Sequence, residues 1–314
     1  SGQFMENYET YIKDQFPLRN RLVALKNYAE LAVGKKELNG IFLCKDNYLI
    51  ENHKKEDYET ERAKKNSEAI ISAGNRWAES LGEEHTSVMV VPTAQTILTD
   101  KLPLFAQCYN QNEYIDSIKK GLKENVFVDV SKVLKEHKDE YIYYRTDHHW
   151  TGYGAYLAYE SWCRLKNLEP YAKEELNIDT VTEDFLGTIH SKINISHKPD
   201  AIEIYSVKDY NTKAVYNMQN TKDTLFDKTF LKGKDKYGVF FGGNQGIVEI
   251  TDNMHMTVTD GRLKENYNQD KNELALKKFK AAEKEGYESA VMFANMAWVY
   301  GCLGESDKVK EYAQ

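Results

Sequence analysis

An alternation of apolar runs and helical patterns between residues 85 and 166 limits the fold of this chain more than any other feature. The run Ser87–Val91 is continuously apolar, as expected of a buried parallel strand, and Pro92 then takes the chain out of the sheet. Further strands are predicted at 126–130 and 141–144, and helices at 111–124, from 131 and at 151–166. Strands that alternate with helices favour a mainly parallel sheet covered by helices on both faces.

Before this region the sequence predicts helices and one hairpin. Helices are expected at 3–14, from Pro17 to about Val33, and at 58–81, with a β-hairpin at 41–44 and 48–50. In the second helix, five apolar or aromatic residues fall on one face: Leu22, Leu25, Tyr28, Ala29 and Ala32.

The remaining sequence changes texture twice. Short β-like runs at 202–207, 214–216, 237–241 and 247–250 lie largely within 180–240, which we interpret as an irregular excursion from the main sheet. Residues 272–314 are helical in pattern, and the spacing of Ala275, Phe279 and Ala282 is typical of tetratricopeptide repeats, with an ordinary helical hairpin as the alternative. We expect an N-terminal helical lead-in at 1–40, an α/β domain at 41–250, a linker at 251–271 and a helical tail at 272–314.

Composition excludes several classes of protein. The net charge of −7 argues against a nucleic-acid partner, and the lack of an 18-residue apolar stretch argues against a membrane span. The four cysteines are scattered without a CxxC spacing, so neither a zinc site nor a disulfide framework is predicted. We expect no cofactor.

The densest cluster of reactive side chains lies at 146–151, between the predicted strand 141–144 and the helix after it. Asp147 and His149 share one side of an extended backbone, so the carboxylate can fix the imidazole tautomer and leave the other nitrogen as a base. His148 points the other way. A base for hydrolysis or acyl transfer, a structural corner and a metal site all remain open, and adjacent histidines make the metal site the least favoured.

Other candidate residues are placed by topology. Thr93 and Gln95 follow the strand at 87–91, where parallel sheets bind ligands. Together with His148 and Trp150 they are our predicted substrate-binding residues.

The sequence Thr-Asp-His-His-Trp-Thr at 146–151 resembles the signature of the DHHW protein family, which is related to the alginate O-acetylation proteins. Further segments resemble family landmarks in the expected order: 14–19, 39–42 with 48–50, 91–93, 100–103 and 240–244. The resemblance covers about 4–250.

This resemblance implies an SGNH-hydrolase-like three-layer α/β domain with a mainly parallel sheet, in a circularly permuted order, followed here by the small all-α tail. It implies an extracytoplasmic O-acyl esterase or acetyltransferase that acts on cell-envelope polysaccharide, with His149 as base and Asp147 as its orienting partner. It also implies a cell-surface location through a membrane anchor outside this sequence. The tail is expected to dock on the α/β domain, on a second chain or on a protein partner, because so few helices cannot bury their own faces.

One departure from the family stands out. The nucleophilic serine is expected on an Asp-Ser turn beyond Gly242–Asn244, yet after Ser206 the only serines are Ser289 and Ser306, both in the helical tail. Without a nucleophile, His149 cannot support an acyl-enzyme, although it can act as a base on a hydroxyl or water. The alternative hypothesis is a non-catalytic surface scaffold that binds glycans or a partner protein.

Overall fold

The computed structural model describes residues 18–208 and 225–240, five strand segments (213–216, 220–222, 247–251, 257–259 and 262–263) and the single residues Leu276, Lys280 and Lys308. The chain forms two compact units. The first comprises Ser1–Asp209 and Lys228–Val239, and the second comprises Tyr210–Asp227 and Phe240–Gln314.

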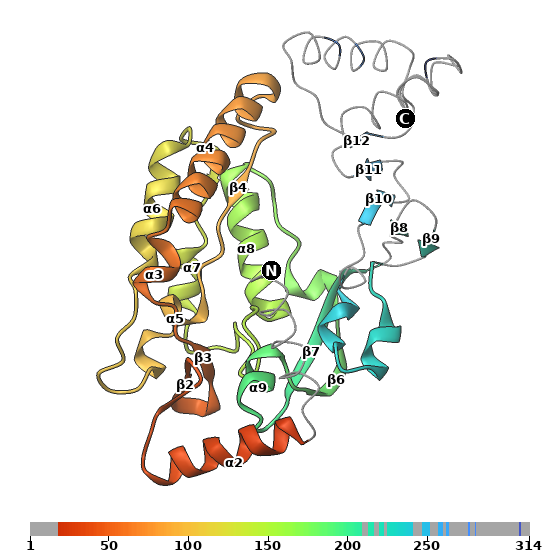
Figure 1. Ribbon diagram of the computed structural model, residues 1–314. Coiled ribbons are helices and arrows are strands. Elements are labelled where there is room, and N and C mark those ends of the chain that lie inside the picture. Colours follow the sequence, from red (N-terminus) through yellow and green to blue (C-terminus); the bar gives the residue numbers. More distant parts are fainter. Residues whose placement is uncertain are drawn as a thin grey trace. The chain divides into compact units, whose positions relative to one another are not determined.

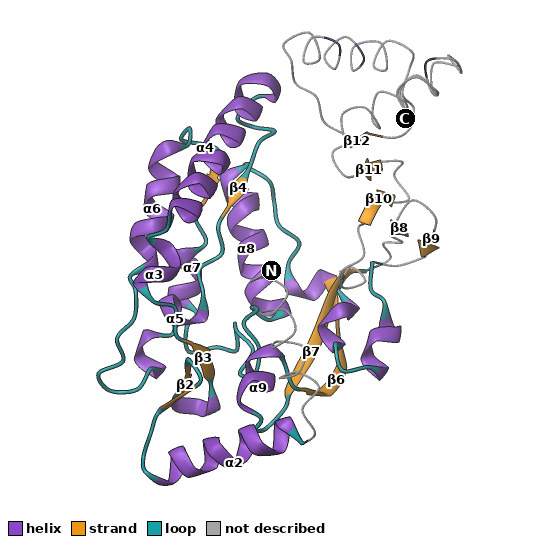
Figure 2. Cartoon of the chain, viewed as in Figure 1, coloured by secondary structure: helices purple, strands orange, loops and turns teal. Residues whose placement is uncertain are grey.

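Helices are the commonest regular elements in the described part of the first unit (Figures 1 and 2). They are α2 (Arg19–Ala32), α3 (Lys55–Tyr58), α4 (Glu61–Leu81), α5 (Ala94–Ile97), α6 (Gln111–Gly121), α7 (Ser131–Glu136), α8 (Gly152–Leu165) and α9 (Thr188–Ile193). Single turns of 3-10 helix are η1 (Lys45–Asn47), η2 (Thr99–Lys101), η3 (Lys173–Glu175), η4 (Lys228–Lys232) and η5 (Lys236–Val239). The helices predicted up to Val33 and at 58–81, 111–124 and 151–166 are therefore confirmed.

The strands of the first unit form three small sheets. An antiparallel meander contains β1 (Glu37–Leu38), β2 (Ile41–Leu43) and β3 (Leu49–Glu51), which confirms the predicted hairpin. The strands β4 (Val88–Met89) and β5 (Phe127–Val128) pair in parallel, and β6 (Leu176–Phe185) pairs antiparallel with β7 (Asp200–Val207). The fold is thus mixed α/β.

The predicted third parallel strand, at 141–144, is wrong. The chain doubles back at this point: the Tyr144 amide donates to the His149 carbonyl at 3.2 Å, and the Thr151 amide donates to the Ile142 carbonyl at 3.0 Å. Because backbone groups of 142–144 are satisfied by residues 149–151, they form only an isolated antiparallel bridge, between Tyr143 and Trp150. Among the described residues the parallel sheet consists of β4 and β5 alone.

The main hydrophobic core lies between the parallel pair and helices α5, α7 and α8. Its buried members include Ile97, Leu98, Val128, Leu134, Ile142, Tyr143 and Leu157. Gly74 lets α4 approach the sheet closely, since a Cβ there would lie 2.6 Å from Leu122 Cδ2 and 3.0 Å from Val88 Cγ2. Cys163 is buried in the same core region.

The region 180–240 is more regular than the sequence indicates. Strands β6 and β7 flank α9, so up to Val207 the excursion predicted there is a two-stranded sheet with a helix between its strands. The strand predicted at 237–241 is wrong at 237–239, because Lys236–Val239 form the turn of 3-10 helix η5, whereas Phe240 makes an isolated antiparallel bridge with Phe226.

Most of the described residues of the second unit form a five-stranded antiparallel sheet in the order β12-β11-β10-β8-β9. Its strands are β8 (Lys213–Tyr216), β9 (Asn220–Lys222), β10 (Ile247–Thr251), β11 (Thr257–Thr259) and β12 (Arg262–Leu263). Strands β11 and β12 lie in the segment expected to be a linker.

Several predictions fall outside the described residues. They are the helix at 3–14, the landmark at Gly242–Asn244 and, apart from three single residues, the helical tail at 272–314. The domain boundaries drawn at 40, 250 and 271 stay predictions. Within the described part of the chain, no helix combines the length and the apolar character needed to cross a bilayer.

Candidate active site

The segment 141–151 forms a tight hairpin whose tip carries the polar cluster. The base of the hairpin is fixed to the sheet, because the buried Tyr143 hydroxyl donates to the Pro92 carbonyl at 2.6 Å, just beyond β4. Thr151 ends the hairpin and caps α8: its hydroxyl accepts from the Gly154 amide at 3.2 Å and donates to the Tyr141 carbonyl at 2.7 Å. The tip therefore lies at the carboxyl end of the parallel pair, where such sheets bind ligands.

A buried carboxylate, Asp200 at the start of β7, holds the first half of the tip. Its oxygens accept from the Tyr141 hydroxyl (2.5 Å), the Arg145 amide (3.0 Å), and both the amide (2.8 Å) and hydroxyl (2.6 Å) of Thr146. The Thr146 hydroxyl in turn accepts from the Gly187 amide at 3.0 Å. Asp200 thus ties the hairpin to the β6–β7 sheet.

Asp147 is a second buried carboxylate, only 2% exposed. One oxygen accepts from the amide of His149 at 3.1 Å and from its ring Nδ1 at 2.5 Å. The other accepts from the amide of Thr188 at 2.8 Å and from its hydroxyl at 2.9 Å. Burial alone would raise the pKa of Asp147, but hydrogen bonds from the His149 ring and the Thr188 and His149 amides outweigh it and hold this pKa well below its usual value.

The close contact between Asp147 and α9 depends on Gly187, the residue before that helix. A Cβ at Gly187 would lie 2.3 Å from Asp147 Cβ and 2.5 Å from its Oδ2. Glycine is therefore the only residue that fits while Asp147 accepts from the first turn of α9.

The His149 imidazole is fixed on two sides. Asp147 accepts the Nδ1 proton, which sets the tautomer. The ring of Tyr237, from η5, stacks on it with centroids 3.9 Å apart and planes 11° from parallel. Among the described residues, no group hydrogen bonds to His149 Nε2, so this nitrogen is open to a ligand.

His148 is connected to the same carboxylate through a hydroxyl. Its Nδ1 lies 2.9 Å from Thr188 Oγ1. Because the Thr188 hydroxyl must donate to the Asp147 carboxylate, it accepts from His148, whose Nδ1 therefore carries the proton. Burial lowers the pKa of His148 despite the nearby Asp147 carboxylate, and His149 lowers it further. One carboxylate thus sets the tautomers of both histidines.

Asp147, His148 and His149 bring possible ligand atoms within 4.8 Å of one another, the spacing of a metal site. The residues fit a metal poorly, since both Asp147 oxygens already accept two hydrogen bonds each. An ion at this carboxylate would have to displace His149 or Thr188.

A sequence match that includes this corner identifies the family to which the chain belongs. The sequence profile described as DHHW protein matches residues 46–273. The chain belongs to the DHHW protein family. The resemblance carried by residues 146–151 is thereby confirmed.

One solved structure supports the fold, and two others show a weaker similarity. A DHHW family protein from Eubacterium siraeum is 24% identical, with a TM-score of 0.51, over 68% of this chain and 72% of that one. Bacillus cereus PatB1 with a sulfonyl adduct is 19% identical, with a TM-score of 0.49, over 67% and 72%. The O-acetyltransferase domain of Pseudomonas putida AlgJ is 16% identical, with a TM-score of 0.40, over 54% and 66%. No curated protein matches the chain.

The other predicted binding residues of this DHHW protein serve different contacts. Gln95 is buried, and its amide bonds to both the N–H (2.6 Å) and the carbonyl (3.1 Å) of His53. Thr93 bonds through its amide and hydroxyl to Gln111. Trp150 is half-buried against the main core. Among the described residues, no hydrogen bond or ring contact joins these three side chains to the His149 imidazole.

Sequence reasoning missed four residues of the corner: Gly187, Thr188, Asp200 and Tyr237. Each lies far along the chain from its partner at the corner, from 40 positions for Gly187 and Asp147 to 88 positions for Tyr237 and His149. A glycine followed by threonine at the start of a short helix is the one local signal that could have indicated the contact with Asp147.

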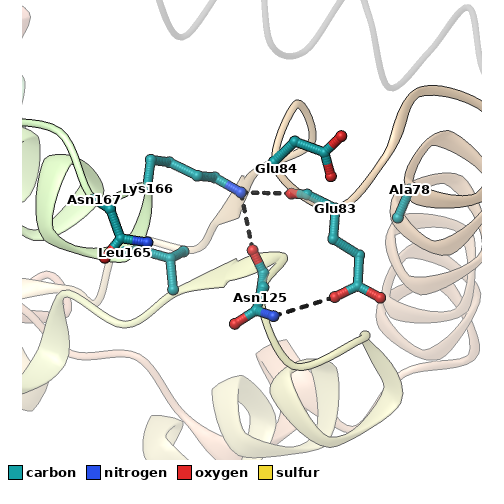
Figure 3. A pocket seen from close by; sticks show the side chains of 7 residues that line it. All are labelled: Ala78, Glu83, Glu84, Asn125, Leu165, Lys166 and Asn167. Atoms are coloured by element: carbon teal, nitrogen blue, oxygen red, sulfur yellow. Dashed lines mark hydrogen bonds between the residues drawn. The ribbon is translucent and has the colours of Figure 1, made fainter.

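A separate cavity of about 510 Å³ opens at the other end of the parallel pair, between the segments that enter β4 and β5 (Figure 3). The Lys166 ammonium projects into it and donates to the carbonyls of Glu83 (2.6 Å), Thr86 (2.7 Å) and Asn125 (2.9 Å). Lys166 thereby joins the end of α8 to both strand entries, a structural role that needs no ligand.

Proposed function

We propose that this DHHW protein acts as an O-acyl esterase or acetyltransferase on cell-envelope carbohydrate, with His149 as the base. The observation that carries this proposal is the contact between the buried Asp147 carboxylate and His149 Nδ1 at 2.5 Å. A base oriented in this way accepts a proton at Nε2, and the carboxylate stabilises the imidazolium that results.

The chemistry proceeds without a serine nucleophile on the protein. A water or sugar hydroxyl bound at Nε2 gives its proton to His149 while its oxygen attacks the acyl carbonyl carbon. When the tetrahedral intermediate collapses, the bond to the departing alkoxide oxygen breaks. The imidazolium then returns the proton to that alkoxide, so the histidine is regenerated.

The substrate class rests on the family resemblance and on the aromatic setting of the base. Tyr237 lies parallel to the imidazole, and His148 lies 3.9 Å from it, ring to ring. Family relatedness to alginate O-acetylation proteins favours an acylated polysaccharide at the cell surface, where we place the protein.

The test is release of acetate from a soluble acetylated polysaccharide by the purified chain. His149→Ala is compared with His85→Ala, a matched control at an exposed histidine outside the corner. We expect His149→Ala to lose at least ~100-fold in rate, the usual contribution of a general base, and His85→Ala to match the parent protein. Equal rates for the parent and His149→Ala would refute the proposal.

A second candidate is a non-catalytic scaffold that binds glycans, with the tail at 272–314 recruiting a partner or a second copy. The absence of serines other than Ser289 and Ser306 after Ser206 favours it. This function predicts that His149→Ala binds the polysaccharide as well as the parent does and that neither releases acetate.

A further inference from the structure

Helix α2 presents an apolar stripe away from the protein. Two residues attach its inner face to the protein. Asn27 is buried and donates to the Ile193 carbonyl at 2.7 Å, and Leu31 packs against a small core to which α9 contributes. Figure 1 shows α2 along the outer edge of the first unit. The opposite face carries six exposed apolar residues, spaced mostly three or four positions apart. The set begins at the residue before the helix and ends at the residue after it: Leu18, Leu22, Leu25, Ala29, Ala32 and Val33.

The stripe is extensive for a surface feature. Leu25 is 67% exposed and Val33 is 77% exposed. At about 100° per residue, the six residues fall within roughly one third of the helix circumference. A contiguous exposed apolar patch of this kind marks a surface that binds another protein or a membrane.

Basic residues border this stripe on both sides. Arg19 and Lys26 follow one margin and Arg21 the other, as the same helical spacing requires. Residues 19–36 contain five Lys or Arg and a single acidic residue, Glu30, a net charge of +4 in a chain whose total is −7. Glu30 pairs with Lys26 at 3.8 Å and with Lys35 at 2.7 Å.

We propose that α2 is an interfacial helix that lies on an anionic lipid surface. A helix with an apolar stripe between basic margins buries the stripe at the boundary between headgroups and acyl chains, while its cations meet the anionic headgroups. With 14 residues, α2 is too short to span a bilayer. Charge complementarity favours anionic lipid over a second copy of α2, which would bring two net-positive helices together.

The test is co-flotation of the intact chain with vesicles of phosphatidylcholine and phosphatidylglycerol, beside vesicles of phosphatidylcholine alone. We expect binding to the anionic vesicles that weakens as salt rises. Leu22→Glu/Leu25→Glu should lower the partition coefficient by about 100-fold or more, since burying each leucine favours binding by roughly tenfold. Arg21→Glu/Lys26→Glu should lower it by roughly fivefold per residue.

The matched control is Leu104→Glu/Phe105→Glu, which places the same two charges on another exposed apolar site, in the loop before α6. This variant should bind the vesicles like the parent, and all variants should keep the parent melting temperature. The proposal is overturned if the intact chain does not bind anionic vesicles or if the Leu22/Leu25 variant binds equally well. It is also overturned if that variant turns a dimer into a monomer while vesicle binding is unchanged.

Discussion

Replacing Gly187 by alanine tests how the corner is held. The backbone of Gly187 has φ −83° and ψ −169°, which alanine adopts without strain, so the substitution adds only a methyl group. That methyl would lie 2.3 Å from Asp147 Cβ and must move about 1 Å away to reach an ordinary 3.4 Å contact. The His149 Nδ1 to Asp147 Oδ1 distance of 2.5 Å would then approach the limit of a hydrogen bond.

The magnitude follows from these distances. Overpacking of this size costs about 1–3 kcal/mol of the free energy of unfolding. A displacement of about 1 Å at a catalytic group costs roughly 100-fold in rate. We therefore expect Gly187→Ala to lower the unfolding free energy by about 2 kcal/mol and acetate release by about 100-fold per folded molecule.

Urea denaturation, acetate release and the downfield proton NMR signal of the His149 Nδ1–H measure the three effects. Gly74→Ala is the matched control, because its Cβ meets Leu122 Cδ2 at 2.6 Å in a core outside the corner. It should lose stability while it keeps both the NMR signal and the activity. If Gly187→Ala retains the downfield signal and is as active as Gly74→Ala, the close contact between Gly187 and Asp147 does not orient His149.

Three further predictions concern carboxylates and a lysine. The pKa of Asp147 is lowered in the folded state, so its ionisation stabilises the protein above the unfolded pKa of about 4, and this stabilisation is lost as pH falls toward the folded pKa. Urea denaturation from pH 7 to pH 3 should show a shallower loss of stability for Asp147→Asn than for the parent, and equal slopes would contradict the assignment. Asp200→Ala leaves the buried donors of Thr146 without their acceptor and should cost about 3 kcal/mol in thermal unfolding, whereas a loss below 1 kcal/mol would contradict its role. Lys166→Met should lower the free energy of unfolding by about 2 kcal/mol without changing acetate release. An unchanged melting temperature would show that the three carbonyl contacts of Lys166 do not stabilise the protein.

The sequence is informative about this corner only over short distances. Asp147 and His149 could be paired in advance because two residues separated by one position share a side of an extended chain. Thr188 and Asp200 could not, because the β6–β7 sheet that brings them to the hairpin leaves no mark near residue 147. The composition of 141–144 suits a strand, yet Tyr144 bonds back to His149, since the sharp reversal at the tip satisfies its backbone locally.

Periodicity has a similar limit in α2. The spacing of Leu22, Leu25 and Tyr28 correctly assigned them to one side of a helix. It could not say which side the protein covers, and the structure covers the side that contains Asn27. A buried asparagine gave no sequence signal, because its hydrogen bond to Ile193 depends on a residue 166 positions away.

The sequence separation between the contacting residues at the corner determines when this site can form during protein synthesis. Thr188 stabilises Asp147 from 41 positions downstream, and Asp200 stabilises Thr146 from 54 positions downstream. A nascent chain that ends before residue 188 lacks both the Thr188 donors to Asp147 and the Asp200 acceptor for Thr146, although its Asp-His-His-Trp sequence is complete. The oriented histidine therefore arises only once β7 has begun to leave the ribosome, and a chain interrupted earlier displays the signature without the geometry.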